Sequence, residues 1–233
     1  MNTTLITGAN RGIGLEFSRQ YAADGWRVLA CARSPESSDA LNTLAAQYPG
    51  QLSVYRLDVA NHPEIDQLAM SLADQSIDLL INNAGVYTDP QGGASNNSDY
   101  YEAWMRAFLV NTMATFKMVR AFRAHIVRSN KKTVVTISSK MGSIADNSSG
   151  GSYMYRSSKA AVNMVVKTLA TDLKPEGVIA LVLHPGWVKT DMGGPHALIS
   201  SMQSVSGMRE VISRLTVEDS GRFISFDGKA IPW

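Results

Sequence analysis

Short apolar runs rich in β-branched residues alternate along the chain with longer segments of helical periodicity. Such alternation is typical of βαβ units that build a parallel sheet. Strands are predicted at residues 3–7, 27–32, 53–56, 78–81, 133–137, 178–183 and 222–226. Helices are predicted at residues 13–24, 41–47, 63–73, 101–129, 155–173 and 207–215. The pattern therefore predicts an α/β fold, a Rossmann-like doubly wound parallel sheet of seven strands flanked by helices.

Three segments interrupt the alternation, at residues 88–99, 141–152 and 192–204, and are predicted to be loops. The third is typical of a flap that closes over a ligand. In the last predicted helix, apolar residues at positions 208, 211, 212 and 215 follow helical spacing, so we expect them to face the sheet. No linker or repeat interrupts the 233 residues, and we interpret residues 1–233 as a single domain.

Composition and charge narrow the function classes. The 22 basic and 20 acidic residues give a net charge of +2 and are scattered, so no nucleic-acid partner is expected. Cys31 is the only cysteine, which excludes an intrachain disulfide. The first residues do not resemble a signal peptide, and no apolar stretch approaches the roughly 18 residues of a membrane helix. We therefore expect a cytoplasmic protein with no membrane span.

Two common kinds of catalytic site are not expected from the sequence. The four histidines are dispersed and form no H-x-x-x-H pair, so we expect no metal site. The G-x-S-x-G turn of many serine hydrolases is also missing from the sequence.

A glycine-rich turn links the first predicted strand to the first helix. In this place the pyrophosphate of a dinucleotide approaches both the backbone and a helix N-terminus. The glycines are not spaced as G-x-G-x-x-G, so the order of strand, turn and helix carries the prediction. A tight turn without a ligand is the alternative. The predicted cofactor-binding residues of this turn are Gly8, Asn10, Arg11, Gly12, Ile13 and Gly14.

The end of the second strand favours NADP(H) over NAD(H). A carboxylate there would bind the 2′-hydroxyl of NAD, whereas an arginine pairs with the 2′-phosphate of NADP. The strand ends at Arg33, and no acidic residue lies between positions 28 and 34. Arg11 offers a second cation. The alternative is that both arginines are solvated surface side chains.

Two further strand ends carry residues suited to the cofactor. Asn83, Ala84 and Gly85 follow the fourth strand at the carboxyl edge of the sheet, where open α/β folds bind ligands. Asp58 and Val59 follow the third strand, where the carboxylate would accept a hydrogen bond from adenine. An aspartate in a loop is also a common turn or cap residue.

Tyr155 and Lys159 are four residues apart and share one face of the predicted helix. A free phenol has a pKa of about 10, and a nearby cation lowers it, which suits a tyrosine to acid-base catalysis. A solvated surface pair would have the same spacing. Ser138 and Ser139 end the fifth strand at the substrate edge, where either hydroxyl would hold a substrate oxygen or serve as a turn residue.

Together these elements make the chain resemble the short-chain dehydrogenase/reductase family. The resemblance covers nearly the whole chain, in the family's order. The matching elements are Thr7 to Gly14, Asp58, Asn82 to Gly85, Asn111, Ile137 to Ser139, Tyr155 to Lys159 and Pro185 to Thr190.

The resemblance implies roles for individual residues. Tyr155 protonates the substrate oxygen and Ser139 positions it, while Lys159 binds the nicotinamide ribose and tunes the tyrosine. Asn111 helps to hold a water that connects Lys159 to solvent. Further cofactor contacts are implied for Pro185, Gly186, Val188 and Thr190.

Ser139 precedes Tyr155 by 16 residues, more than in many members of the family. This spacing, the residues between 150 and 159 and the terminal residues 231–233 resemble the subgroup of C-factor-like and sniffer-like carbonyl reductases. Tyr153 lies at i, i+6 from Lys159 and therefore off its helix face, so the acid-base role is assigned to Tyr155.

We therefore predict an NADP(H)-dependent oxidoreductase that moves a hydride between nicotinamide and a carbonyl or alcohol. Substrate choice is assigned to residues 87–100, 141–154 and 192–204, whose composition indicates an apolar ligand. The resemblance implies a homodimer or homotetramer formed through residues 101–129 and 155–173. The alternative, from a different class, is an NADP(H)-binding regulatory or signalling protein with little turnover.

Overall fold

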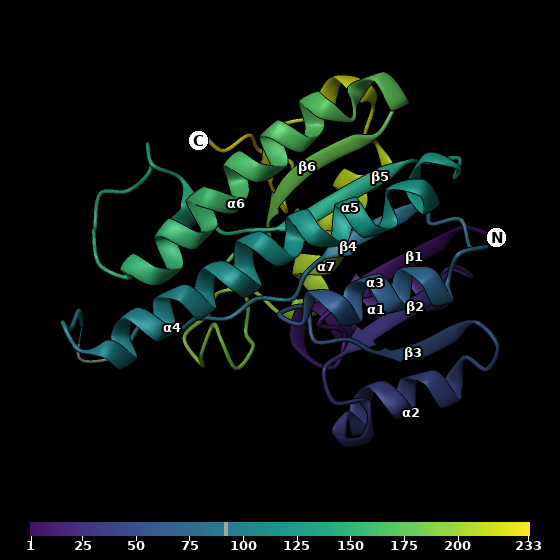
Figure 1. The fold of residues 1–233 in the computed structure, drawn as a ribbon, viewed down its shortest axis with the longest axis horizontal. Helices are drawn as coiled ribbons and strands as arrows, with labels where there is room; N and C mark the ends of the chain where they lie inside the picture. Colours follow the sequence, from purple (N-terminus) through teal and green to yellow (C-terminus); the bar gives the residue numbers. More distant parts are fainter. Residues whose placement is uncertain (91–92) are drawn as a thin grey trace.

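The computed structural model describes residues 1–90 and 93–233, and Gln91 and Gly92 of the predicted 88–99 loop lie outside the described residues. One parallel sheet has the order β3-β2-β1-β4-β5-β6-β7 (Figure 1). The predicted Rossmann-like α/β fold is thereby confirmed. The strands are β1 (Thr3–Thr7), β2 (Arg27–Ala32), β3 (Leu52–Arg56), β4 (Leu79–Asn82), β5 (Thr133–Ile137), β6 (Ile179–His184) and β7 (Phe223–Ser225).

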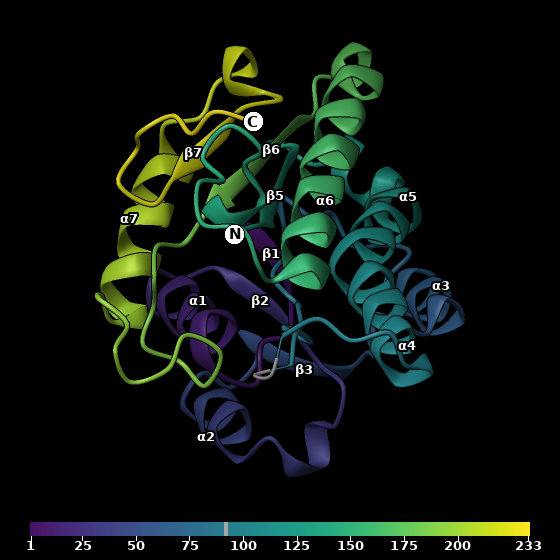
Figure 2. The ribbon, with the colours of Figure 1, turned by 90° about the vertical axis from the view of Figure 1, so that its left-hand side faces the viewer.

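Helices cover both faces of the sheet. Figure 2 shows α1, α2 and α7 on one side and α3 to α6 on the other. Their bounds are α1 (Gly12–Ala23), α2 (Asp39–Gln47), α3 (His62–Ser71), α4 (Ser98–Phe108), α5 (Ala114–Val127), α6 (Tyr153–Asp172) and α7 (Ser201–Ser213).

The apolar strands are buried because both faces of a parallel sheet carry helices. Successive side chains of a strand point to opposite faces. In β1, Leu5 joins the core beneath α3, α5 and α6, whereas Ile6 joins the core beneath α1 and α7. Met208 of α7 lies in the second core, as its helical spacing predicts.

The predicted helix over residues 101–129 is not continuous. A π-helical turn, Leu109–Met113, separates α4 from α5. The helix axis continues through such a turn, so the apolar periodicity does not reveal it. The start of α4 also lies earlier than predicted, because the Asn97 side chain accepts a hydrogen bond from the Tyr100 N–H at 2.9 Å and caps the helix at that point.

The predicted loop over residues 192–204 is wrong at its end, where α7 has already begun. The Ser200 hydroxyl accepts a hydrogen bond from the Gln203 N–H, and the Gln203 side chain accepts one from the Ser200 N–H, both at 3.1 Å. This reciprocal capping box starts the helix. Likewise, α6 begins at Tyr153, two residues before the predicted start.

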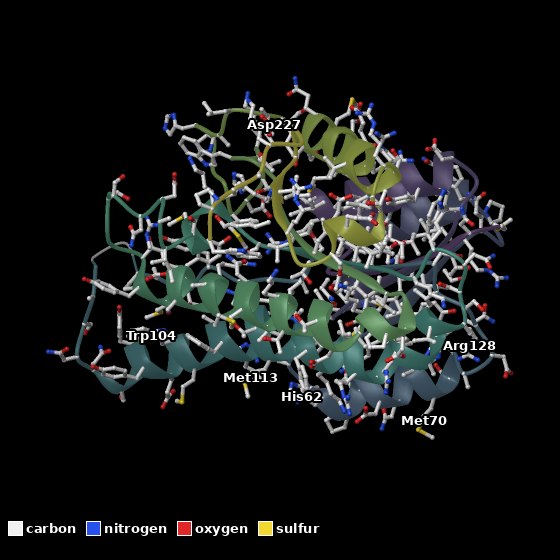
Figure 3. All side chains as sticks on the ribbon, turned by 90° about the horizontal axis from the view of Figure 1, so that it is seen from above. His62, Met70, Trp104, Met113, Arg128 and Asp227 are labelled. Atoms are coloured by element: carbon white, nitrogen blue, oxygen red, sulfur yellow. The ribbon has the colours of Figure 1, made fainter. Side chains whose placement is uncertain are left out.

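The methionines of α4, the π turn and α5 divide between core and surface. Met118 is buried, whereas Met105 and Met113 are exposed on the outer side of these helices, where Figure 3 labels Met113. Among the described residues, no helix has both the length and the apolar character needed to cross a membrane.

Candidate active site

The glycine turn and the segment after β4 lie side by side, because β1 and β4 are neighbours whose chains continue to opposite faces of the sheet. Gly8 adopts a φ of +65°, and a Cβ there would come within 3.0 Å of the Ala84 Cα. A Cβ on Gly14 would come within 2.2 Å of the Gly8 carbonyl oxygen. Only glycine lets the backbone pass this close at these two positions.

Asn83 fastens this turn to the end of β4. Its side-chain amide donates to the carbonyl oxygens of Thr7 and Gly8 at 2.9 and 3.1 Å. In return, the Thr7 hydroxyl accepts hydrogen bonds from the N–H groups of Asn83 and Ala84 at 3.0 and 3.1 Å. Two loops that are distant in sequence therefore form one rigid platform.

The outer residues of the turn remain accessible. Asn10, Gly12 and Ile13 are partly exposed and Arg11 is exposed. Arg11 forms an ion pair with Asp191, on the loop after β6. A Cβ on Gly12 would lie 3.2 Å from the Thr190 side chain, so the same loop lies against the glycine turn.

Arg33 lies at the end of β2 and is exposed. Within residues 1–90 and 93–233, no hydrogen bond or ion pair engages its guanidinium. A free guanidinium at this edge is available to an anionic ligand.

Asp58 has a turn role in this structure. Its carboxylate accepts a hydrogen bond from the Ala60 N–H at 3.0 Å, and its own N–H donates to the Glu64 carboxylate at 2.9 Å. Arg106 lies 3.9 Å from the same carboxylate. Val59 beside it is buried in the core. The carboxylate thus also stabilises the turn, and the binding of adenine by Asp58 and Val59 stays a prediction.

Tyr155 and Lys159 lie together in the first turns of α6. Both are buried, with 9% and 5% of their surface exposed, and the Lys159 Nζ is 5.7 Å from the centre of the tyrosine ring. The ammonium donates a hydrogen bond to the carbonyl oxygen of Ile137, at the end of β5, at 3.0 Å. Tyr153 is 57% exposed. The pair is therefore a buried arrangement rather than a solvated helix face.

Ser139 caps the short turn Lys140–Gly142 after β5, and its hydroxyl accepts a hydrogen bond from the Met141 N–H at 3.1 Å. A Cβ on Gly142 would come within 2.8 Å of the Lys159 backbone, so this turn packs directly on α6. Ser138 is more deeply buried than Ser139. The turn brings Ser139, not Ser138, to the tyrosine.

Burial sets the proton affinities of the pair. It raises the pKa of Tyr155 to about 12, and a hydrogen bond from the Ser139 side chain acts in the opposite direction. Burial lowers the pKa of Lys159 to about 8, because a charged ammonium is poorly solvated there. The expected lowering of the tyrosine pKa by Lys159 is wrong for this structure, because burial raises that pKa and Lys159 is not among the groups that shift it.

Asn111 lies in the π-helical turn and is buried. Its side chain accepts a hydrogen bond from the Val86 N–H at 2.8 Å and donates to the Val86 carbonyl and the Ser158 hydroxyl, both at 2.9 Å. A Cβ on Gly85 would lie 3.3 Å from the Asn111 oxygen and 3.5 Å from the Lys159 Nζ. The π turn therefore brings Asn111 to the lysine across a glycine.

The loop after β6 begins with Pro185 and Gly186, and Gly186 has a φ of +84°. Val188 is buried and pairs with Ile199, which closes the loop on itself. The indole N–H of Trp187 donates to the Gly193 carbonyl at 2.8 Å. The predicted flap is thus a hydrogen-bonded loop in this structure.

Tyr87 begins the 87–100 segment to which substrate choice was assigned, but its contact with Tyr155 was not predicted. Its ring centre lies 5.0 Å from that of Tyr155, and its hydroxyl and the Ser152 hydroxyl are 2.8 Å apart. It follows directly after the segment Asn82 to Val86, which brings it to the same edge of the sheet. In the described part of the chain, no three His, Cys, Asp or Glu side chains gather as metal ligands.

The chain is similar to known proteins over most of its length. The family model described as short chain dehydrogenase matches residues 2–197. The chain is 42% identical over 165 residues to C-signal of Myxococcus xanthus, which covers 71% of this chain and 98% of that protein.

Solved structures of carbonyl reductases are similar to the whole chain. The NADPH-bound carbonyl reductase from chicken fatty liver is 33% identical with a TM-score of 0.89, covering 100% of this chain and 99% of its own. The carbonyl reductase Sniffer of D. melanogaster is 30% identical with a TM-score of 0.90, covering both chains completely. The resemblance to sniffer-like and C-factor-like proteins is confirmed.

We expect Lys159→Met to make the protein more stable at pH 7. The buried ammonium is charged there, and its lowered pKa corresponds to at most about 3 kcal/mol of lost stability. Between about pH 8 and 10.5 the unfolded chain keeps this proton while the folded protein has lost it, so wild-type stability rises with pH in that window. The difference between variant and wild type therefore shrinks by pH 10. Urea unfolding at both pH values measures it.

The exposed Lys174 supplies the control, because Lys174→Met removes a lysine that is already solvated. Its effect on the free energy of unfolding should be the same at pH 7 and pH 10. A Lys159→Met variant that is less stable than wild type by equal amounts at pH 7 and pH 10 would contradict the buried-charge interpretation.

Proposed function

The chain belongs to the short-chain dehydrogenase family, and from this premise we propose an NADP(H)-dependent oxidoreductase that interconverts a carbonyl compound and its alcohol. The observation that carries the proposal is the buried pair of Tyr155 and Lys159 beside the Ser139 hydroxyl. A general acid and its cationic partner that are held out of water suit proton transfer to a substrate oxygen.

The glycine turn fits a dinucleotide. The space that a Cβ would take at Gly8 and Gly14 is filled by backbone, which leaves the outer side of the turn open to a pyrophosphate. Thr190 lies against Gly12 and would contact the nicotinamide end. The free guanidinium of Arg33 fits the 2′-phosphate of NADP. The NADPH in the chicken carbonyl reductase structure supports the same cofactor for this chain.

In the direction of reduction, bound NADPH supplies the hydride to the carbonyl carbon. Tyr155 donates its hydroxyl proton to the carbonyl oxygen, and its raised pKa keeps the phenol protonated at neutral pH. The Ser139 oxygen accepts the Met141 N–H, and its hydroxyl, which bonds with Tyr155 in this structure, would donate to the same substrate oxygen once the substrate is bound. The Lys159 ammonium stabilises the phenolate that remains on Tyr155.

The surroundings of Tyr155 favour an apolar substrate. Tyr87 contacts its ring and is 45% exposed. Trp187 and Met192, on the loop after β6, also expose large apolar surfaces. Such side chains bind the body of a hydrophobic carbonyl compound while the polar hydroxyls orient its oxygen.

We also propose that the protein forms a homodimer or homotetramer through α4, α5 and α6. Phe116 on α5 and Met164 on α6 are large, exposed apolar residues, as is Met113 in the π turn. Apolar side chains on neighbouring helices are typical of surfaces that associate.

Tyr155→Phe tests the assignment of the acid. Loss of the hydroxyl should lower kcat by about 10²- to 10⁴-fold, the usual contribution of a general acid. The exposed Tyr153 is the matched control, and Tyr153→Phe should keep kcat within about twofold of wild type. The rate of NADPH oxidation at a saturating concentration of a carbonyl substrate gives kcat for both variants. The assignment fails if the two variants show the reverse pattern.

Arg33→Ala tests the cofactor preference. A lost charge-assisted contact of about 1.5–3 kcal/mol should lower kcat/KM for NADPH by about 10- to 100-fold and leave kcat/KM for NADH nearly unchanged. Arg128, at the far end of the molecule in Figure 3, is exposed, and Arg128→Ala serves as the control. Equal or better use of NADH by the wild-type protein would refute the NADP assignment.

A second candidate is an NADP(H)-binding signalling protein with little turnover, favoured by the similarity to C-signal. The two functions differ in NADPH consumption. We expect NADPH absorbance to fall in the presence of some members of a panel of aldehydes, ketones and quinones. Tight NADPH binding without consumption across the panel would favour the signalling protein.

A further inference from the structure

The helix that carries Tyr155 begins without a cap of its own. Ser152, at the N-cap position of α6, has a φ of +48°, and its side chain makes no capping hydrogen bond. The first N–H groups of a helix have no partner within the helix and need one from elsewhere. The position of the catalytic turn therefore depends on whatever binds those groups.

Asp89 supplies the missing cap from the loop after β4. One carboxylate oxygen accepts a hydrogen bond from the Met154 N–H at 3.0 Å, and the other accepts one from the Tyr155 N–H at 2.8 Å. A carboxylate at a helix N-terminus also interacts favourably with the helix dipole. The backbone of Tyr155 itself is thus held by a side chain that is 66 residues away in sequence.

The residues before Asp89 reinforce this contact. The Thr88 hydroxyl donates a hydrogen bond to the Met154 sulfur at 3.2 Å, and the Tyr87 hydroxyl bonds with that of Ser152. Three successive side chains therefore hold the first turn of α6. The same segment is fixed at its other end by the paired hydrogen bonds between Val86 and Asn111.

We propose that Asp89 is a positioning residue for Tyr155, and this rests on the proposed function, in which Tyr155 is the acid. The carboxylate sets the height and rotation of the first turn of α6, and with them the place of the tyrosine hydroxyl. A displacement of about 1 Å at a reacting group lowers catalysis by about 10²-fold. Asp89 acts through the backbone and does not touch the reacting atoms.

Graded variants test the role. Asp89→Asn keeps one acceptor oxygen and the side-chain shape, whereas Asp89→Ala keeps neither. We expect kcat to fall about tenfold for Asp89→Asn and up to about a hundredfold for Asp89→Ala. The Kd for NADPH, measured by fluorescence quenching, should stay within about twofold of wild type. The substrate in these kcat measurements is the aldehyde, ketone or quinone of the panel that the wild-type protein reduces fastest.

Two controls separate positioning from ordinary stabilisation. The Asp219 carboxylate accepts a hydrogen bond from the Thr216 N–H at 3.0 Å and caps the short turn Val217–Asp219, which does not carry Tyr155. Asp219→Ala and Asp219→Asn therefore make the same two graded changes at a cap outside the proposed site. Both should lower the melting temperature as much as the Asp89 variants or less, and both should keep kcat within about twofold of wild type.

Hydrogen exchange supplies a readout that is independent of turnover. The Tyr155 amide should exchange faster in Asp89→Ala than in wild type, because it loses its acceptor. Unchanged exchange would overturn the contact itself. Wild-type kcat in Asp89→Ala, with an inactive Tyr155→Phe, would overturn the positioning role alone. A fully active Tyr155→Phe would overturn the proposed function and the role of Asp89 with it.

Discussion

Taking the ammonium group of Lys159 out of water costs free energy that only polar partners offset. In the structure, the segments that follow two neighbouring strands, β4 and β5, meet at Lys159. The Ile137 carbonyl at the end of β5 accepts the hydrogen bond from the ammonium. Gly85 after β4 and Gly142 after β5 come so close to Lys159 that a side chain at either position would touch it. Gly85 and Gly142 therefore provide the space in which Lys159 is buried.

This convergence depends on the parallel sheet. All seven strands run in one direction, so the carboxyl ends of β1, β4, β5 and β6 meet at the same edge. Strands are added to one side of β1 as far as β3 and to its other side from β4 onward, and a sheet with such a reversal has a crevice at its carboxyl edge between β1 and β4. The glycine turn that Asn83 binds lies at this point of the edge. The parallel sheet therefore brings the glycine turn and the pair of Tyr155 and Lys159 to the same edge.

The strands, their order along the chain and the pairing of Tyr155 with Lys159 were predictable, since each depends on local periodicity or spacing. The π turn was not, because it leaves the apolar pattern of α4 and α5 intact. The raised pKa of Tyr155 was also missed, since burial is a property of the fold and not of the spacing. The role of Asp89 depends on a contact between residues far apart in sequence, which no local pattern contains.

The segment from Asn83 to Asp89 joins these parts. Asn83 binds the glycine turn, Val86 binds Asn111 in the π turn, and Asp89 binds the first turn of α6. Each contact uses the backbone of at least one partner, so it fixes the course of the chain and not only a side chain. The glycine turn, the π turn and the first turn of α6 are therefore held in register by a single short stretch of chain.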